Sequence, residues 1–308
     1  NQGVTMKILM VCDKVGSAIY RLALGVQKYN QHLDINIIAV HPKRPDSEQL
    51  RVWEEEGKKA DILDFEYWKT YIYLRDNYPE LMNKPKILAH YNPYNIFEEK
   101  WEELDLIIAP NRTIYEQMRR NQKVRYIPIT IDIDKFPYQR EYGDSNMVNM
   151  VSGRIESKKG ALEVAQVCKE LGYKMLLVGS ISRRDYFDEI VETGVVEFRE
   201  NITDEELLKA YQESAIHICN SIDNFESGTM PVLEAMAVGV PVLARNVGHI
   251  PDLFNGKNMV VRKGQPEDNE DLKKELKSLM EDKKKRLEIR ENAWGTVKVR
   301  DDRRRAIE

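Results

Sequence analysis

The 308-residue sequence has few cysteines, no long apolar run and no excess of basic charge. Its three cysteines, Cys12, Cys168 and Cys219, are far apart and lack the spacing of metal ligands, which indicates reduced core thiols in a cytoplasmic protein. No apolar run approaches the roughly 18 residues that span a membrane. The early run ILMVC ends at Asp13 and predicts a strand, not a signal peptide.

The charge balance excludes general nucleic-acid binding, which usually requires a basic domain. Lys and Arg number 47 against 51 Asp and Glu, for a formal net charge of −4. Hydrophobic residues make up 42%, enough to build cores, and the length suits two domains of ordinary size.

A dinucleotide fingerprint is also missing. The loop after the first apolar run, DKVGSAIY, has one glycine, Gly16, where G-x-G-x-x-G needs three, so we do not expect NAD binding. Gly16 allows close approach of a ligand to the backbone, and Ser17 suits the cap of a following helix. An ordinary turn glycine is an equally good interpretation.

What the sequence does have is alternation of strands and helices. In the first half a helical period runs from Ile19 to Tyr29, and residues 45–84 hold one or two helices rich in Tyr and Trp. The expected strands of this half are Lys7–Cys12, Ile35–Val40, Ile87–His90, Leu106–Ala109 and Arg125–Ile127.

A polar segment, PYQREYGDSN at Pro137–Asn146, predicts a linker, after which a second alternating series begins. We therefore expect an α/β protein of two doubly wound Rossmann-like domains, at residues 6–140 and 146–290, with a tail at 291–308 returning toward the first domain. The charged segment 267–305 is expected to be helical and solvated. The expected elements of the second series are Met147–Ser152, Ala161–Leu171, Met175–Val178, Asp204–Glu213, Ala215–Asn220, Pro231–Val238 and Pro241–Arg245.

The segment FESGTMPVLEAMAVGVPVLARNVGHIPD carries two glutamates, Glu226 and Glu234, across a loop-to-helix junction. Pro231 suits the first helical position and places Met230 at the N-cap, where its side chain accepts no hydrogen bond. A helix start without a local acceptor is a good anion site, with Glu234 in the first turn at the same mouth. A carboxylate that complements the helix dipole is the alternative.

A second loop, SGRIESKKG, joins a predicted strand to a predicted helix. Arg154 and Lys159 lie beside the start of that helix, where cations are unfavourable unless an anion binds there too. A diphosphate would be neutralised by both side chains and would accept the helix N–H groups. A solvated basic loop is the alternative.

These segments resemble the retaining GT-B glycosyltransferases of family 4. EsgtmpvlE with AMAVGVPVLA and VGHIPDL is similar to the donor-site signature of that family, and GRIESKKG to its GR-x4-KG loop. IPITID is similar to IPNGVD, and DLIIAPNRTIYEQM to the strand and helix before it. The resemblance implies the GT-B fold, with an acceptor-side domain and a nucleotide-sugar-binding domain facing an interdomain cleft.

The resemblance also implies a set of site residues. Arg154 and Lys159 would hold the phosphates, Glu234 the ribose hydroxyls, and Glu226 with the following amides the transferred sugar. Gly16 would approach the distal phosphate, and His90 would lie near the sugar, unless it is only a strand-end histidine satisfied within the fold. The implied catalytic residues are Arg154, Lys159, Glu226 and His90, and the implied donor-binding residues are Gly16, Gly153, Gly228, Thr229, Met230, Val232 and Glu234.

The sequence departs from the family at a few positions. Ser17 follows Gly16 where a second glycine is common, Ile129 and Thr130 replace the Asn-Gly of IPNGVD, and His249 replaces the second glycine of VGGIP. No final helix is recognisable in RDDRRRAIE, so a truncated chain is an open alternative.

The function implied is retaining transfer of a sugar, a hexose in the first instance, from a UDP- or GDP-sugar to a hydroxyl of a glycan, lipid-linked or small-molecule acceptor. Attack would occur from the front face. No cofactor and no metal are expected, because Arg154 and Lys159 would neutralise the diphosphate and the D-x-D at Asp132 and Asp134 matches the IPNGVD segment. A nucleotide-sugar 2-epimerase-like enzyme and a non-catalytic nucleotide-sugar binding module are the alternatives. The basic segment Arg112–Arg125 is either a solvated helix face or a contact for an anionic acceptor or a membrane surface.

Overall fold

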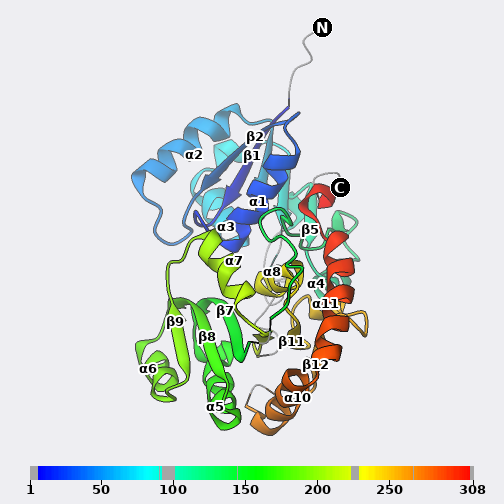
Figure 1. The fold of residues 1–308 in the computed structure, drawn as a ribbon. Helices are drawn as coiled ribbons and strands as arrows, with labels where there is room; N and C mark the ends of the chain where they lie inside the picture. Colours follow the sequence, from blue (N-terminus) through cyan, green and yellow to red (C-terminus); the bar gives the residue numbers. More distant parts are fainter. Residues whose placement is uncertain are drawn as a thin grey trace. The chain divides into compact units, whose positions relative to one another are not determined.

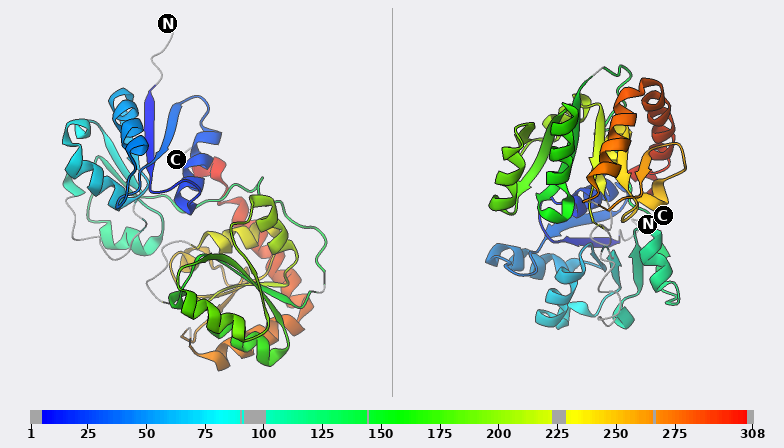
Figure 2. Two further views of the ribbon diagram at one scale, coloured as in Figure 1. Left: turned by 90° about the vertical axis from the view of Figure 1, so that its left-hand side faces the viewer. Right: turned by 90° about the horizontal axis from the view of Figure 1, so that it is seen from below.

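The computed structural model describes residues 6–89, 91, 101–143, 145–222, 229–265 and 267–305. The chain divides into two units, Asn1–Ile131 with Arg300–Glu308, and Asp132–Val299. Each unit holds one six-stranded parallel sheet with helices on both faces (Figures 1 and 2). The predicted α/β class with two doubly wound domains is confirmed.

In the first unit the strands run in the order β2-β1-β3-β4-β5-β6, and every pair is parallel. The sequence did not predict β3, although it lies at the centre beside β1. The elements are β1 (Lys7–Cys12), α1 (Ala18–Tyr29), β2 (Asp34–Ala39), α2 (Ser47–Lys59), β3 (Ile62–Phe65), α3 (Trp68–Asn77), β4 (Lys86–Ala89), β5 (Leu106–Ala109), α4 (Arg112–Met118), β6 (Val124–Tyr126) and α12 (Asp302–Arg305).

The sequence of strand β1 is apolar without alternation because both of its faces are buried. Leu9 and Val11 pack into a cluster that includes Trp53 of α2, while Met10 and Cys12 pack on the opposite face of the sheet against α1. A parallel sheet covered on both faces requires such a strand.

The segment from Arg300 onward joins the first unit. The Ile131 N–H donates to the Arg300 carbonyl at 2.8 Å, and the Asp302 N–H donates to the Ile131 carbonyl at 3.0 Å. Helix α12 packs on α1 at Gly25, where a Cβ would lie 2.1 Å from Asp302 Oδ2. Of the expected tail 291–308, residues 291–298 instead complete helix α11 of the second unit.

In the second unit the strand order is β12-β11-β10-β7-β8-β9. Counted from β7, this is the 3-2-1-4-5-6 order of a dinucleotide-type fold, with its switch point between β7 and β10. The elements are β7 (Met147–Ile155), α5 (Ala161–Leu171), β8 (Lys174–Ile181), α6 (Arg184–Glu192), β9 (Val196–Arg199), α7 (Asp204–Gln212), β10 (Ile216–Cys219), α8 (Met230–Val238), β11 (Val242–Arg245), α9 (Ile250–Leu253), β12 (Val260–Arg262), α10 (Asn269–Glu281) and α11 (Lys283–Lys298).

The polar segment 137–146 is attached to the second unit. The Gln139 N–H donates to the Val238 carbonyl at 2.9 Å, and the Tyr142 hydroxyl donates to the Ala215 carbonyl. The guanidinium of Arg290 lies 4.4 Å from the centre of the Tyr142 ring. These contacts place residues 132–146 with the second unit, so the division falls at Ile131, before the polar segment.

The expectation that segment 267–305 is solvated is wrong. Helix α10 buries Leu272, Leu276 and Leu279 and packs against α5, while α11 packs against α8. The charges of these helices lie on their outer faces, and the apolar stripe at helical spacing makes them part of the core. Arg286 and Arg290 of α11 are also buried.

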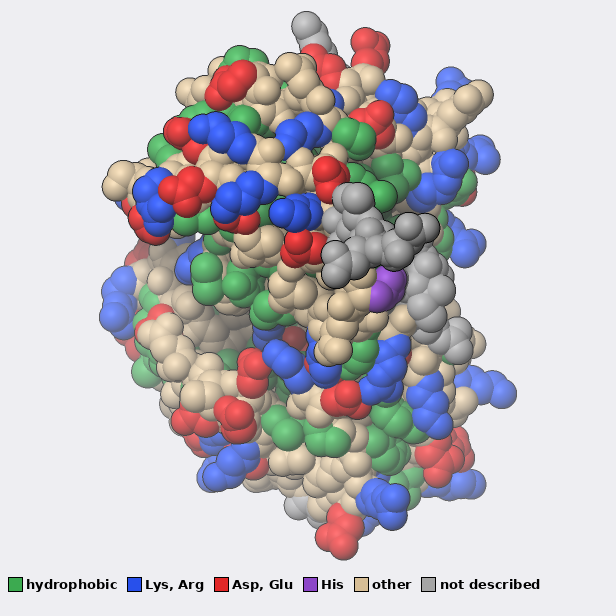
Figure 3. Space-filling model, turned by 90° about the horizontal axis from the view of Figure 1, so that it is seen from above, with side chains coloured by type: hydrophobic (Ala, Val, Ile, Leu, Met, Phe, Trp, Pro, Cys, Tyr) green, Lys and Arg blue, Asp and Glu red, His purple; other side chains and the backbone are tan. Residues whose placement is uncertain are grey.

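The three cysteines are buried thiols outside any disulfide of the described residues, as predicted, and burial raises the pKa of the Cys168 thiol to about 12. Over the described residues, every helix is too short or too polar to cross a membrane. On the face seen in Figure 3, Lys and Arg side chains are interspersed with Asp and Glu.

Candidate functional site

The loops that follow β7 and β10 are hydrogen-bonded to each other. The Ile222 N–H donates to the Lys158 carbonyl at 2.9 Å, and the Asn220 side-chain amide donates to the Gly160 carbonyl at 3.1 Å. Both loops lie at the carboxyl ends of the two strands that flank the switch point, where open α/β sheets form their ligand crevice. This edge of the second sheet is therefore the candidate site.

Gly160 makes the joining of these loops sterically possible. Its φ of +69° is disfavoured for residues with a Cβ. A Cβ here would also lie 2.5 Å from Asn220 Nδ2 and 2.7 Å from the Asn220 carbonyl oxygen. The last glycine of SGRIESKKG is thus required by the fold at this edge.

The two cations of that loop lie in different settings. Strand β7 continues past the expected end at Ser152, so Arg154 belongs to the strand; its side chain is 67% exposed, and Nε lies 3.6 Å from Glu156 Oε1. Lys159 is half-buried at the end of a single 3₁₀ turn, Ser157–Lys159. A guanidinium and an ammonium within one short loop can together neutralise a dianion.

Helix α5 does not offer its first turn to a ligand in the way the sequence predicted. The Leu162 N–H donates to the hydroxyl of Tyr186 from α6 at 3.0 Å. Burial raises the pKa of Tyr186 to about 12, so the hydroxyl stays neutral and serves as an internal acceptor. The expectation that this first turn supplies free N–H donors for a phosphate is wrong at Leu162.

Helix α8 begins one residue earlier than predicted. Thr229 is the N-cap and Pro231 occupies the second helical position, which corrects the assignment of Met230 as the cap. Thr229 Oγ1 lies 2.9 Å from Nε2 of His249, and the Thr229 N–H donates to the same nitrogen at 3.2 Å. Because this nitrogen accepts from a backbone N–H, it carries no proton in this arrangement.

Glu234 lies in the second turn of α8, not in the first as predicted. Its side chain is buried, and its Oε2 accepts a hydrogen bond from the Tyr211 hydroxyl at 2.8 Å. Met230 and Val232 are buried as well, so any ligand contact from them must come through the backbone.

A second buried polar pair joins the two strands that flank the switch point. His217 of β10 and Asn149 of β7 are register partners, with His217 Nδ1 2.6 Å from Asn149 Oδ1. Burial lowers the pKa of His217 to about 3, so the imidazole is neutral at physiological pH. The Tyr211 ring meets the His217 ring edge-on at 5.7 Å.

Two buried arginines, which the sequence reasoning missed, hold the start of the loop after β10. Arg245 ends β11 and donates from Nη1 to the Ser221 carbonyl at 2.9 Å. Arg262 ends β12 and donates from Nη1 to Asn220 Oδ1 at 2.5 Å. A charged residue at the end of an apolar strand is the signal that could have identified both. Tyr211 and His249 were also missed as site residues, and the departure from the family pattern at His249 marked that position.

Three predicted residues, His90, Glu226 and Gly228, lie outside the described residues. Gly153 is exposed, with room for a Cβ. In the first unit Gly16 is exposed with φ +76°, and Ser17 caps α1 as predicted, accepting from the Tyr20 N–H at 3.1 Å. The second unit brings together the loop of Arg154 and Lys159 and residues 220–222, which follow β10.

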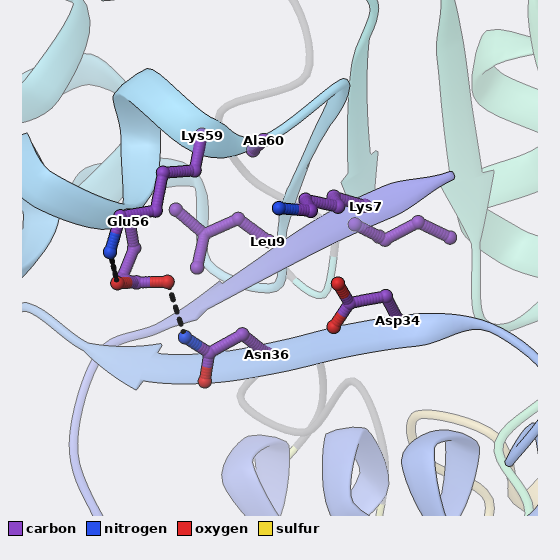
Figure 4. A pocket seen from close by; sticks show the side chains of 8 residues that line it. Lys7, Leu9, Asp34, Asn36, Glu56, Lys59 and Ala60 are labelled. Carbon is purple, nitrogen blue, oxygen red and sulfur yellow. Dashed lines mark hydrogen bonds and ion pairs between the residues drawn. The ribbon is translucent and has the colours of Figure 1, made fainter. Parts of the chain in front are cut away.

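A small pocket in the first unit is not at such an edge. Figure 4 shows it beside the starts of β1 and β2, with Lys7 and Asp34 on its walls. Glu56 on its rim already accepts from Lys59 at 2.6 Å and from Asn36 at 2.9 Å. Lys7 is the first residue of β1 and Asp34 is the first residue of β2. The pocket therefore lies at the amino edge of the sheet, opposite the edge where such folds bind ligands.

The D-x-D motif is part of a turn, in which the Asp134 N–H donates to Asp132 Oδ1 at 3.3 Å. Across the described ranges, no three His, Cys, Asp or Glu side chains are grouped as metal ligands would be.

Residues 133–295 match a family model described as glycosyl transferases group 1. No curated protein sequence matches the chain significantly.

Solved structures resemble the chain over nearly its whole length. A glycosyltransferase from Rickettsia africae has a TM-score of 0.75 at 18% identity, covering 98% of this chain and 96% of its own. HepE from Anabaena, solved with UDP and glucose, has a TM-score of 0.77 at 16% identity, covering 98% and 97%. Sucrose-phosphate synthase from Thermosynechococcus elongatus has a TM-score of 0.77 at 14% identity, covering 98% and 96%. Because the sequence identities are only 14 to 18%, this structural likeness establishes the fold alone.

Proposed function

The chain belongs to the glycosyl transferases group 1 and is a glycosyltransferase of the GT-B fold, and on that premise we propose that it transfers a sugar from a nucleoside-diphosphate donor to a hydroxyl acceptor with retention of configuration. The retaining chemistry is that of family 4, which the motifs around Arg154, Lys159 and Glu234 resemble.

One observation carries the proposal: the hydrogen-bonded pair of loops at the carboxyl ends of β7 and β10. Lys158 and Gly160 on one loop bind Ile222 and Asn220 after β10, so the cationic loop and residues 220–222 form one polar edge. A nucleotide sugar needs such an edge, with cations for its diphosphate and acceptors for its hydroxyls.

We assign the diphosphate to Arg154 and Lys159. The exposed guanidinium of Arg154 can rotate toward an incoming phosphate, since its contact with Glu156 at 3.6 Å is that of a weak surface pair. Stabilising the charge on the departing diphosphate in this way lowers the barrier to transfer. The two side chains would thus supply the neutralisation that makes the reaction independent of a metal.

We assign the ribose hydroxyls to Glu234 and the transferred sugar to Glu226 and the amides after it. A carboxylate can accept from two vicinal hydroxyls at once, which suits a ribose. The Thr229 N–H already donates to His249 Nε2, so we exclude that amide from the sugar contacts.

A uridine donor is the first candidate. HepE was solved with UDP and glucose and with UDP-glucose, and its fold matches this chain over almost its full length.

The test is a binding screen followed by turnover. Thermal shift with UDP, GDP and ADP, and then with their hexose derivatives, selects the donor. Transfer to a panel of hydroxyl acceptors then yields a product whose anomeric configuration is read by NMR. Retention of the donor configuration in the presence of EDTA is the expected result; an inverted product, or turnover that requires an added divalent ion, contradicts the proposal.

A control without acceptor separates the two alternatives. A 2-epimerase would convert the nucleotide sugar in the absence of acceptor, and a binding module would release no nucleoside diphosphate over the whole panel. We expect release of nucleoside diphosphate that depends on the acceptor.

A further inference from the structure

The carboxylate of Glu234 is hydrogen-bonded to a tyrosine that comes from another helix. Tyr211 of α7 donates its hydroxyl to Glu234 Oε2 at 2.8 Å, and the same hydroxyl lies 3.3 Å from the Pro231 carbonyl of α8. Both side chains are almost wholly buried, Tyr211 at 0% and Glu234 at 1% exposure. A tyrosine hydroxyl at 2.8 Å lies at the usual length of an O–H···O hydrogen bond, so it orients the carboxyl group.

The tyrosine has little freedom to move. Its ring lies between Phe136, at 6.3 Å and 78°, and His217, at 5.7 Å and 64°. Both contacts are edge-to-face, the favoured geometry for aromatic pairs. His217 is in turn fixed by Asn149 on the neighbouring strand. The hydroxyl of Tyr211 is therefore held at one point relative to the sheet.

We propose that Tyr211 is a positioning residue of the donor site, fixing the Glu234 carboxylate so that it accepts hydrogen bonds from the vicinal hydroxyls of a ribose. The inference rests on the proposed function, which places the ribose at Glu234. An ionised carboxylate has about four lone-pair sites, and Tyr211 takes one of them. The tyrosine thereby selects ribonucleotides over deoxyribonucleotides without touching the ligand.

The experiment compares affinities for UDP, 2′-deoxy-UDP and 3′-deoxy-UDP by calorimetry, in the unaltered enzyme and in Tyr211→Phe. The unaltered enzyme should prefer UDP by about 10-fold over each deoxy analogue, the value of one hydrogen bond to a charged group. In Tyr211→Phe this preference should fall to about threefold or less, because the carboxylate is no longer oriented. A loss of general stability would weaken all three ligands equally and leave the preference intact.

Tyr142→Phe is the matched control. It also removes a tyrosine hydroxyl that is hydrogen-bonded within the second unit, to the Ala215 carbonyl, and should keep the preference for UDP. If Tyr211→Phe keeps the whole preference while the unaltered enzyme shows it, the inference is wrong and the proposed function stands. If the unaltered enzyme binds none of the nucleoside diphosphates of the screen, the proposed function falls, and the inference with it.

A second variant covers the case in which Tyr211→Phe does not fold. Phe136→Leu keeps the hydroxyl but removes one of the two rings that hold Tyr211. It should narrow the preference for UDP in part; an unchanged preference contradicts the claim that the fixed ring positions the carboxylate.

Discussion

Three helices of the first unit, α1, α2 and α4, begin with their own acceptors, whereas α5 and α8 at the centre of the second sheet begin without them. The side chains of Ser17, Asp46 and Asn111 accept from the first turns of α1, α2 and α4, at 3.1, 2.7 and 2.8 Å. The N-cap of α5 is Gly160, which has no side chain, and the N-cap of α8 is Thr229, whose side chain makes no cap hydrogen bond in the described structure.

Within the second unit the same contrast holds between centre and edge. Helices α7 and α10, which follow the edge strands β9 and β12, carry local caps at Thr203 and Asp268. Helices α5 and α8 follow β7 and β10. At their starts, the N–H groups of Leu162 and Thr229 donate to the side chains of the distant residues Tyr186 and His249. Helices α3, α6 and α9 also start without a side-chain cap, so a missing cap does not by itself mark the switch point. What distinguishes α5 and α8 is that N–H groups at their starts donate to side chains of distant residues, Tyr186 and His249, at the edge where such folds bind ligands.

The largest effect on activity is expected when the ammonium group of Lys159 is removed. Lys159→Ala should lower turnover by about 100- to 1,000-fold, because the charge on the departing diphosphate is no longer stabilised. The melting temperature should stay the same. Initial rates with the donor selected by the screen provide the measurement.

The matched control is Lys158→Ala, an exposed neighbour in the same 3₁₀ turn, which should retain near-normal turnover. Equal losses in the two variants would mean that the loop contributes general positive charge and that the specific assignment of Lys159 is wrong.

Gly160→Ala tests the close approach of the loops that follow β7 and β10. The methyl group would meet Asn220 at 2.5 Å in a backbone of positive φ, so the unfolding free energy should fall by about 3 kcal/mol. Gly172→Ala is the control: its φ is +73°, but a Cβ there meets nothing within 4 Å. Strain alone should cost this variant about 1 kcal/mol. Urea unfolding gives both values, and equal losses would show that contact with Asn220 is unimportant.

The buried histidine at the centre of the second sheet should make the protein sensitive to acid. The pKa of His217 is about 3 in the folded state, below the ordinary value of 6.5. As the pH falls from 6.5 toward 3, the unfolded chain takes up a proton that the folded chain does not. The unfolding free energy should therefore fall by up to about 1.4 kcal/mol per pH unit on account of this residue.

His217→Gln lacks the titrating group but keeps a donor for Asn149. Its unfolding free energy, measured by urea titration at several pH values, should decline less steeply than that of the unaltered protein below pH 6.5. Parallel curves for the two proteins would contradict the assignment.

The smallest effect is expected at an edge helix with its own cap. The Thr203 hydroxyl accepts from the Glu206 N–H at 3.2 Å, while the Glu206 side chain accepts from the Thr203 N–H at 2.7 Å. Thr203→Ala should cost about 1 kcal/mol of stability, and Thr203→Ser much less. Donor affinity should be unchanged in both, and a weaker donor affinity in Thr203→Ala would break the distinction between edge and centre.

Much of the fold could be predicted because it depends on local patterns. The apolar runs around Leu9 and Ile218 predicted strands, and the spacing from Ile19 to Val26 predicted α1. Strand β3, Ile62–Phe65, was missed because Asp64 interrupts its apolar residues, whereas the equally short β4 and β5 hold unbroken apolar runs. The buried faces of α10 and α11 were missed because their outer charges dominate the composition.

The candidate site, too, could be predicted only where it depends on residues close together in the chain. The sequence by itself determined the cationic loop with Arg154 and Lys159, the glycine at Gly160 and the short helix α8. Each of these depends on residues close together in the chain. Only the tertiary structure decided which groups meet at the start of each helix. Leu162 binds Tyr186 and Thr229 binds His249, contacts that span 24 and 20 residues and leave no periodic trace in the sequence. A hydrogen bond between distant residues is set by how the helices pack on the sheet, and that packing is absent until the chain has folded.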